Sequence, residues 1–128
     1  DEEAIQAYLE ENALTASYTR TDEGIYYRIT QTGLGANPSS SANVTVHYAG
    51  RLLDGTQFDS SYERGAPSTF SLTAVIEGWR LSVPLLNIGA RGTFIIPSHL
   101  AYGKNPPSGS AIPSNAVLIF DIELISVN

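Results

Sequence analysis

Apolar and polar residues alternate over residues 25–30, 44–48 and 118–124. This period of two is typical of half-buried β-strands. In the last of these segments the alternation predicts that Asp121 and Glu123 face solvent while their apolar neighbours face a core. The three segments therefore predict strands of a sheet with a buried face.

Other stretches extend this predicted sheet. Residues 91–97 form another strand-like run, and residues 70–72 continue the sheet. Asp54-Gly55 is a strong turn signal, so residues 51–53 and 57–60 are expected to form a hairpin or a bulged connection.

The first twelve residues have the spacing of an amphipathic helix. Ile5, Tyr8 and Leu9 recur at positions i, i+3 and i+4, and acidic residues at the start favour the positive end of the helix dipole. This segment predicts a helix over residues 1–12. Its apolar stripe is expected to dock on its own domain or on a second copy of the chain.

A second helix is predicted over residues 77–87. Pro84 lies inside it and removes one backbone hydrogen bond, which predicts a bend or a short helix, and Gly89 is a natural stop. The Gly-, Ser-, Asn- and Pro-rich stretches 33–42 and 104–113 are expected to be loops. An antiparallel sheet with one packed helix is an α+β domain.

Composition narrows the possible functions. The chain has 128 residues, 42% of them hydrophobic, which is enough for one domain with a single core. Its net charge of −6, with only seven Lys and Arg, argues against nucleic acid as a partner. No apolar stretch is long enough to span a membrane. The chain has no Cys, and neither His47 nor His99 forms a metal constellation, so no metal is predicted.

The strongest functional signal is a set of aromatic residues in five separate segments, each in a local pattern that turns the side chain inward: Tyr48, Phe58, Trp79, Tyr102 and Phe120. One carboxylate, Asp59, directly follows the second of them. Taken singly, each aromatic is better explained by core packing, but jointly they indicate an apolar pocket with one polar corner. Without a Cys or a paired His, such a pocket is expected to act through the surroundings that it gives a substrate.

Eight motifs follow one another in a recognisable order: Val44–Gly50, Leu53–Ser61, Arg64–Pro67, Val75–Trp79, Ile96-Pro97, Leu100–Gly103, Ile112-Pro113 and Asn115–Leu124. Together they resemble the FKBP-type peptidyl-prolyl cis-trans isomerases over residues 20–127. The resemblance implies an α+β fold in which a curved antiparallel sheet wraps around one short α-helix. It divides the chain into an N-terminal helical extension, residues 1–19, and an isomerase domain, residues 20–128. It implies no cofactor.

The resemblance also implies roles in the pocket. Trp79 is the expected floor on which a proline ring lies, and the other inward rings are its walls. The backbone N–H of Ile76 and the hydroxyl of Tyr102 are expected to bind substrate carbonyls on either side of the proline. The implied catalytic residues are Tyr48, Phe58, Asp59, Trp79, Tyr102 and Phe120, and the implied substrate-binding residues are Arg64, Val75, Ile76 and Ile112.

The polar corner is expected to orient groups rather than to transfer protons. Asp59 should join a network with the Tyr48 hydroxyl and Arg64, and a cation beside an Asp lowers its pKa and makes it a poor base. His47 lies opposite Tyr48 in the alternation, which predicts a structural or exposed position away from the pocket.

The chain departs from the family pattern at several positions, among them Ser108 or its neighbours, which stand where a His is common. Ser68 replaces a common aromatic, and Ala111 replaces a common Ile, which should widen the rim. The resemblance implies binding of macrolides such as tacrolimus or rapamycin, weakened by about 1–2 kcal/mol through the lost apolar area. Ser82 and Pro84 replace typical helix residues behind Trp79 and are expected to tilt its indole.

Two functions fit the resemblance. The first is isomerisation of exposed X-Pro bonds in folding polypeptides, with a preference for an apolar residue before the proline. The second is a non-catalytic binding or chaperone module that holds proline-containing segments in the same pocket. The acidic helical lead-in is similar to that of bacterial envelope-associated members, which implies the envelope or periplasm and lipid anchoring through a missing upstream segment. Because the chain begins at Asp1 and not at Met, a leader is expected to have been removed, or the sequence to have been trimmed.

Overall fold

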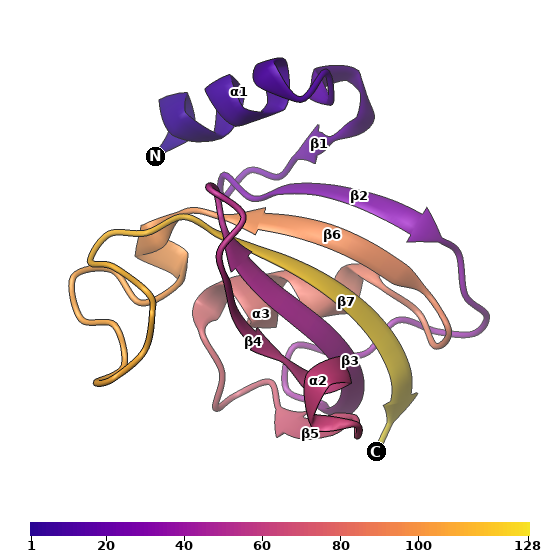
Figure 1. The fold of residues 1–128 in the computed structure, drawn as a ribbon. Helices are drawn as coiled ribbons and strands as arrows, with labels where there is room; N and C mark the ends of the chain where they lie inside the picture. The colour runs from indigo at the N-terminus through magenta and orange to yellow at the C-terminus, as the bar shows by residue number, and fades with distance from the viewer.

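A computed structural model describes residues 1–128 as a curved sheet with helices on both of its faces (Figure 1). In chain order the elements, with η for a 3₁₀ helix, are α1 (Glu2–Glu11), η1 (Thr15–Ser17), β1 (Thr19–Arg20), β2 (Tyr26–Gln31), β3 (Asn43–Leu52), β4 (Gln57–Ser60), α2 (Ser61–Arg64), β5 (Ser68–Ser71), α3 (Glu77–Ser82), η2 (Val83–Leu85), β6 (Arg91–Ile96), η3 (Ser98–Leu100) and β7 (Leu118–Val127). The expected α+β class is confirmed. None of the helices has the length and apolar character needed to cross a membrane.

The sheet is antiparallel and has the strand order β1-β2-β6-β7-β3-β4. The free edge of β3 is shared by two short strands. Its first half, residues 43–46, pairs with β5, and its second half, residues 49–51, pairs with β4. The hairpin expected around Asp54-Gly55 is confirmed as the β3–β4 connection, with Gly55 at φ +92°.

The main core lies between the concave face of the sheet and α3. The alternation along β7 holds, since Leu118, Phe120, Ile122 and Leu124 are all buried and lie in the main core cluster. Figure 1 shows α3 under the curve of β3 and β7, with α1 beyond the opposite face.

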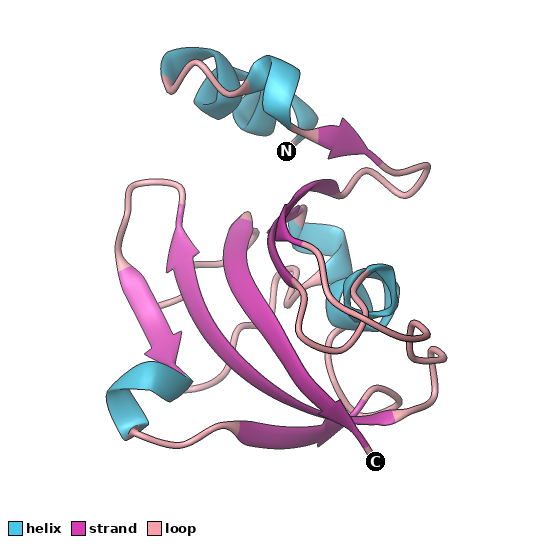
Figure 2. Cartoon of the chain, turned by 90° about the vertical axis from the view of Figure 1, so that its right-hand side faces the viewer, coloured by secondary structure: helices cyan, strands magenta, loops and turns pink.

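The second face of the sheet is covered by the N-terminal helix (Figure 2). Ile5 and Leu9 are 0% and 2% exposed, and they form a second apolar cluster with Tyr26, Ile95 and Ile119. The predicted helix over residues 1–12 is confirmed, and its apolar stripe docks on its own chain.

The helix predicted over residues 77–87 is too long. The α-helical part, α3, ends at Ser82, and Val83–Leu85 form a single 3₁₀ turn that contains Pro84. Because proline has no backbone N–H, the α-helical bonding cannot continue through it. Leu86 is already extended, at ψ 148°. The expected shortening at Pro84 is thus confirmed, and Gly89 lies beyond the end of the helix.

Candidate active site

A cavity of about 270 Å³ opens where β3, β4, β5, β7 and α3 come together. Nine of its ten lining residues are hydrophobic, and the tenth is a carboxylate, so the cavity is apolar with one charged corner. The lining residues are Tyr48, Phe58, Asp59, Phe70, Ala74, Val75, Ile76, Trp79, Tyr102 and Phe120.

Trp79, at the centre of this aromatic cluster, is only 4% exposed. Its ring meets Tyr48, Phe70 and Phe120 in near-perpendicular contacts, with ring centroids 5.1, 5.2 and 5.3 Å away. Perpendicular contacts of this kind are favourable because the positive edge of one ring meets the negative face of another. The indole Nε1 is buried and has no hydrogen-bond partner, so packing alone fixes the ring. The indole therefore lines the cavity although Ser82 and Pro84 follow it in the chain.

Two phenylalanines form the wall that faces β3. The rings of Phe58 and Phe120 lie perpendicular to each other, with centroids 5.6 Å apart. Both approach Gly50 so closely that a Cβ at this position would lie 2.6 Å from Phe58 and 2.8 Å from Phe120. Glycine at position 50 therefore allows these rings to reach their places.

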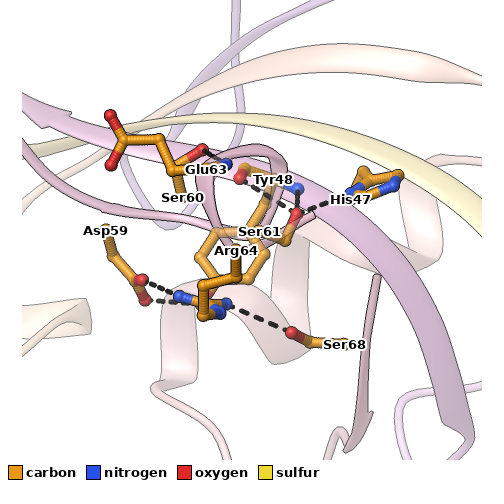
Figure 3. Close-up of polar contacts among 8 residues, drawn as sticks. All are labelled: His47, Tyr48, Asp59, Ser60, Ser61, Glu63, Arg64 and Ser68. Atoms are coloured by element: carbon orange, nitrogen blue, oxygen red, sulfur yellow. Dashed lines mark hydrogen bonds and ion pairs between the residues drawn. The ribbon is translucent and has the colours of Figure 1, made fainter. Parts of the chain in front are cut away.

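The polar corner is a network around the hydroxyl of Tyr48. This hydroxyl donates a 2.5 Å hydrogen bond to Oδ2 of Asp59, and it accepts one of 3.0 Å from Nη2 of Arg64. Arg64 also forms an ion pair with Asp59 and donates a 3.2 Å bond to the hydroxyl of Ser68 (Figure 3). The side chains of Arg64 and Asp59 are 48% and 38% exposed, so their pairing orients groups more than it stabilises the fold.

The network sets the charge state of the corner. Burial alone would raise the pKa of Asp59, but hydrogen bonds from Tyr48 and Arg64 outweigh burial and hold this pKa below its ordinary value. Burial, followed by the hydrogen bond to Asp59, raises the pKa of the Tyr48 hydroxyl. At neutral pH the carboxylate is therefore an ionised acceptor, which makes it a poor general base.

Hydrogen bonds at the start of α2 hold this helix against β3 and bring Arg64 within reach of the Tyr48 hydroxyl. The Ser60 hydroxyl caps α2 by accepting a 3.3 Å bond from the Glu63 N–H, and Gly65 ends the helix in a left-handed conformation with φ +75°. The fully buried Ser61 accepts a 2.7 Å bond from the backbone N–H of Tyr48. The four residues of α2 are thus tied directly to the strand that carries Tyr48.

His47 lies on the other face of β3, as the alternation predicts. Its Nδ1 is 2.8 Å from the Ser61 hydroxyl, and its ring stacks on Tyr62 with centroids 4.6 Å apart. It does not line the cavity. No group of three or more His, Cys, Asp or Glu side chains is placed to hold a metal ion.

Two hydrogen-bond donors at the cavity have no partner within the chain. The backbone N–H of Ile76, in the extended residue before α3, makes no hydrogen bond, and neither does the hydroxyl of Tyr102. Burial, followed by the negative charge of Asp59, raises the pKa of Tyr102, so its hydroxyl keeps its proton. The cavity therefore offers two neutral donors to a ligand.

The structure brings together most of the residues that the sequence singled out. Arg64 lies outside the lining but bonds to two lining residues. Ile112 also lies outside it, 7% exposed and packed in the main core. Phe70 and Ala74 also line the cavity, although the sequence predicted no role for them there. Those that line it as expected are Tyr48, Phe58, Asp59, Val75, Ile76, Trp79, Tyr102 and Phe120.

Comparison with known proteins adds independent information. The family model for FKBP-type peptidyl-prolyl cis-trans isomerases matches residues 35–125. The chain is 44% identical over 122 residues to the FKBP-type peptidyl-prolyl cis-trans isomerase FkpA of Aeromonas hydrophila, covering 95% of this chain and 45% of that protein. The chain spans about half the length of the curated relatives that it matches.

Solved structures give the same result. The crystal structure of FkpA from Escherichia coli superposes with a TM-score of 0.87 at 38% identity, covering all of this chain and 60% of that one. A peptidyl-prolyl cis-trans isomerase from Pseudomonas syringae pv. tomato superposes with a TM-score of 0.85 at 32% identity, covering 98% of this chain and 92% of that one. The chain therefore belongs to the FKBP-type peptidyl-prolyl cis-trans isomerase family.

Proposed function

We propose that this chain accelerates cis-trans rotation about X-Pro bonds in polypeptides and that it does so without a covalent intermediate. The observation that carries the proposal is an aromatic cavity that has one ionised corner and two unpaired neutral donors. Such a cavity can hold a proline ring and its flanking carbonyls, and it contains no side chain suited to nucleophilic attack.

The reaction needs a changed environment rather than a reactive group. Resonance gives the X-Pro amide partial double-bond character, with a rotation barrier of about 18–20 kcal/mol. At the twisted transition state this resonance is lost and the carbonyl oxygen carries less negative charge. Hydrogen bonds from water to that oxygen favour the planar ground state, so a cavity that removes the water lowers the barrier.

Each part of the cavity has a proposed role. The proline ring lies on Trp79, and the edges of the surrounding rings replace water around the amide carbonyl. The N–H of Ile76 and the hydroxyl of Tyr102 bind the carbonyls on either side of the proline and hold the peptide twisted. The polar network of Asp59 and Arg64 fixes the Tyr48 ring in the wall.

A protease-coupled assay with Leu-Pro and Phe-Pro peptides tests this proposal. Replacing Tyr102 by phenylalanine removes one hydrogen bond to substrate and should lower kcat/KM by about three- to tenfold. Phe58→Ala removes a wall and should lower kcat/KM at least about tenfold. Tyr62→Phe is the matched control, because Tyr62 loses the same hydroxyl outside the cavity and should leave kcat/KM unchanged.

The same experiment separates isomerisation from passive binding. Circular dichroism must show that the Phe58→Ala chain remains folded. If a proline peptide binds to the unmodified chain and is not isomerised, the cavity belongs to a non-catalytic binding or chaperone module and the proposal fails.

The same cavity is the proposed site for macrolides such as tacrolimus or rapamycin. Ser68, whose hydroxyl accepts a hydrogen bond from Arg64, stands where the family commonly has an aromatic side chain. Macrolides should therefore inhibit isomerisation competitively and with weak affinity, and Ser68→Phe should tighten the inhibition. Inhibition that does not compete with peptide would place the macrolide elsewhere.

We further propose that the protein acts in the bacterial envelope or periplasm on proline-containing segments of folding polypeptides, and that an upstream segment anchors it by a lipid. The acidic helical lead-in before the FKBP-type motifs supports this proposal through its similarity to that of envelope-associated members of the family. Fractionation of cells that make the full gene product tests it, and recovery in the cytoplasm alone would refute it.

A further inference from the structure

The residue that precedes α1 is bound to the segment that carries Tyr102. Asp1 is the N-cap residue of α1, yet its carboxylate makes no hydrogen bond to the amides of its own helix. A carboxylate at this position ordinarily accepts from the second or third amide of the helix. Here Oδ2 of Asp1 accepts instead from the backbone N–H of Ser98 at 2.7 Å and from the Ser98 hydroxyl at 2.5 Å.

Ser98 in turn holds the backbone on both sides of Tyr102. Its carbonyl accepts hydrogen bonds from the N–H of Ala101, at 3.0 Å, and from the N–H of Gly103, at 2.9 Å. Ser98 is only 8% exposed, whereas Asp1 lies at the surface, so the buried end of this chain of hydrogen bonds is shielded from water and its bonds to the carboxylate are charge-assisted. One residue therefore connects the carboxylate of Asp1 to both neighbours of Tyr102.

The two bonds to Ser98 are the only ones that the amides of Ala101 and Gly103 donate, whereas the carbonyls of Tyr102 and Gly103 accept bonds of 3.0 and 2.6 Å from the N–H groups of Asn105 and Asn115. Ala101 lies outside regular helix or strand geometry, at φ −114° and ψ −119°, and Gly103 is left-handed, at φ +54°. The chain then forms no regular element until β7 begins at Leu118. Because the Tyr102 hydroxyl makes no hydrogen bond, the backbone of this turn and the packing of the ring set its direction.

We propose that Asp1 is a positioning residue for Tyr102, so that the docking of α1 sets the aim of the hydroxyl that binds substrate. This inference rests on the proposed function, because the role of Tyr102 is part of it. The N-terminal helix is then a working part of the isomerase and not only a cover for the second face of the sheet.

The competing explanation is that the Asp1–Ser98 contact merely fastens the helix. The chain offers a matched control for it, since the next residue, Glu2, fastens the same helical turn to Arg20 with bonds of 3.0 and 3.1 Å and does not touch Ser98. Arg20→Ala therefore removes these bonds at the same end of α1, with the Tyr26 hydroxyl still bound to Glu2, and leaves the connection to Tyr102 intact.

Two measurements on the full chain test the proposal. Asp1→Ala should lower kcat/KM for a Leu-Pro peptide by about three- to tenfold, because small misplacements of a binding group are costly. It should also speed amide hydrogen exchange at Ala101 and Gly103. Arg20→Ala should change neither quantity by more than about twofold, since exposed ion pairs contribute little. Asp1→Asn retains an acceptor oxygen and should recover most of the loss.

A double-mutant cycle gives the decisive result. In a Tyr102→Phe background the Asp1→Ala substitution should cost little more, because the group that it positions is gone. Equal losses in both backgrounds, equal effects of Asp1→Ala and Arg20→Ala, or unchanged exchange at Ala101 and Gly103 would each overturn the inference. If the unmodified chain does not isomerise peptides, the proposed function fails instead, and the exchange rates still decide whether Asp1 holds this turn.

Discussion

The close approach of two rings to Gly50 makes the aromatic wall testable with a single methyl group. Gly50 lies on the inward face of β3, opposite Phe120 on β7 and Asp59 on β4. An alanine Cβ there would lie 2.6 Å from Cζ of Phe58 and 2.8 Å from Cε1 of Phe120. To reach an ordinary contact of about 3.4 Å, the Phe58 ring must retreat by about 0.8 Å.

The direction of this retreat decides the consequences. Phe58 is half-buried and lines the cavity, whereas Phe120 is 4% exposed and packed against Trp79, so Phe58 is the ring that moves. Overpacking of this size costs about 1–3 kcal/mol in folding free energy. For a chain of this length each kcal/mol lowers Tm by about 3–5 °C. Because the displaced ring is a wall of the site, kcat/KM for a Leu-Pro peptide should fall by about tenfold or more.

Thermal unfolding and the protease-coupled assay check both effects in Gly50→Ala. The control is Ala49→Ser. It adds one atom to the preceding residue of the same strand, which faces the opposite side of the sheet, and it should leave kcat/KM unchanged. If Gly50→Ala keeps the Tm and the kcat/KM of the unmodified chain, the rings do not lie as described. A loss of Tm with full activity would separate Phe58 from the reaction.

Three further predictions concern the other parts of the site. Phe70→Leu removes a ring packed 5.2 Å from the indole of Trp79, so KM should rise about threefold, and the emission of this single tryptophan should shift to the red; unchanged emission would mean that Phe70 does not support the indole. Tyr48→Phe leaves the Asp59–Arg64 pair without its third member and should cost about 1–2 kcal/mol of folding free energy, measured by urea unfolding; no loss of stability would show that the hydroxyl is not bound in solution. The lowered pKa of Asp59 means that its ionised form stabilises the fold above the ordinary value of 3.8 and that this stability is lost as pH falls through the lowered pKa. The stability difference between the unmodified chain and Asp59→Asn should therefore be constant from neutral pH to about pH 5 and shrink towards pH 3, and a constant difference over the whole range would contradict the network.

The concave half of the fold was predictable because alternation is a local property of the sequence. The opposite face was not, since the residues that cover it lie far away in the chain. Ile95 and Ile119 point away from the main core and are buried under α1. The runs 94–96 and 117–120 are apolar at every position, a pattern that indicates cover on both faces of a strand. The pattern does not say which element supplies this cover.

Short helices set a second limit. The four residues of α2 are too few to show helical periodicity, although Ser60 and Gly65 mark its ends with ordinary capping signals. The residue at which α3 ends could not be predicted either, because it depends on how strongly Pro84 disturbs the helix. Pro84 ended the α-helix at Ser82 and left one 3₁₀ turn in place of a bend.

In the site, the sequence was informative where a side chain lies on a regular element. Phe70 alternates with the fully buried Leu72 on the same strand-like run, so its inward direction could have been inferred. Ile112 lies in the irregular stretch before β7, where no period relates sequence position to direction. A motif placed it near the pocket; the structure buries it in the same core cluster as Tyr48, Trp79 and Phe120 but outside the cavity lining, and its role in substrate binding stays a prediction.

The polar corner follows from the way in which β4 and β5 share one edge of β3. Pairing with β5 ends at Val46 and pairing with β4 begins at Ala49, so Tyr48 stands at the gap between them. The chain must cross this gap between the two strands, and α2 is the crossing. Asp59 precedes that crossing and Arg64 ends it, which delivers a carboxylate and a guanidinium to the Tyr48 hydroxyl from residues only five positions apart. This part of the site is therefore encoded in one short segment, whereas the contact of Trp79 with Phe120 requires α3 to pack against a strand almost forty residues further along the chain.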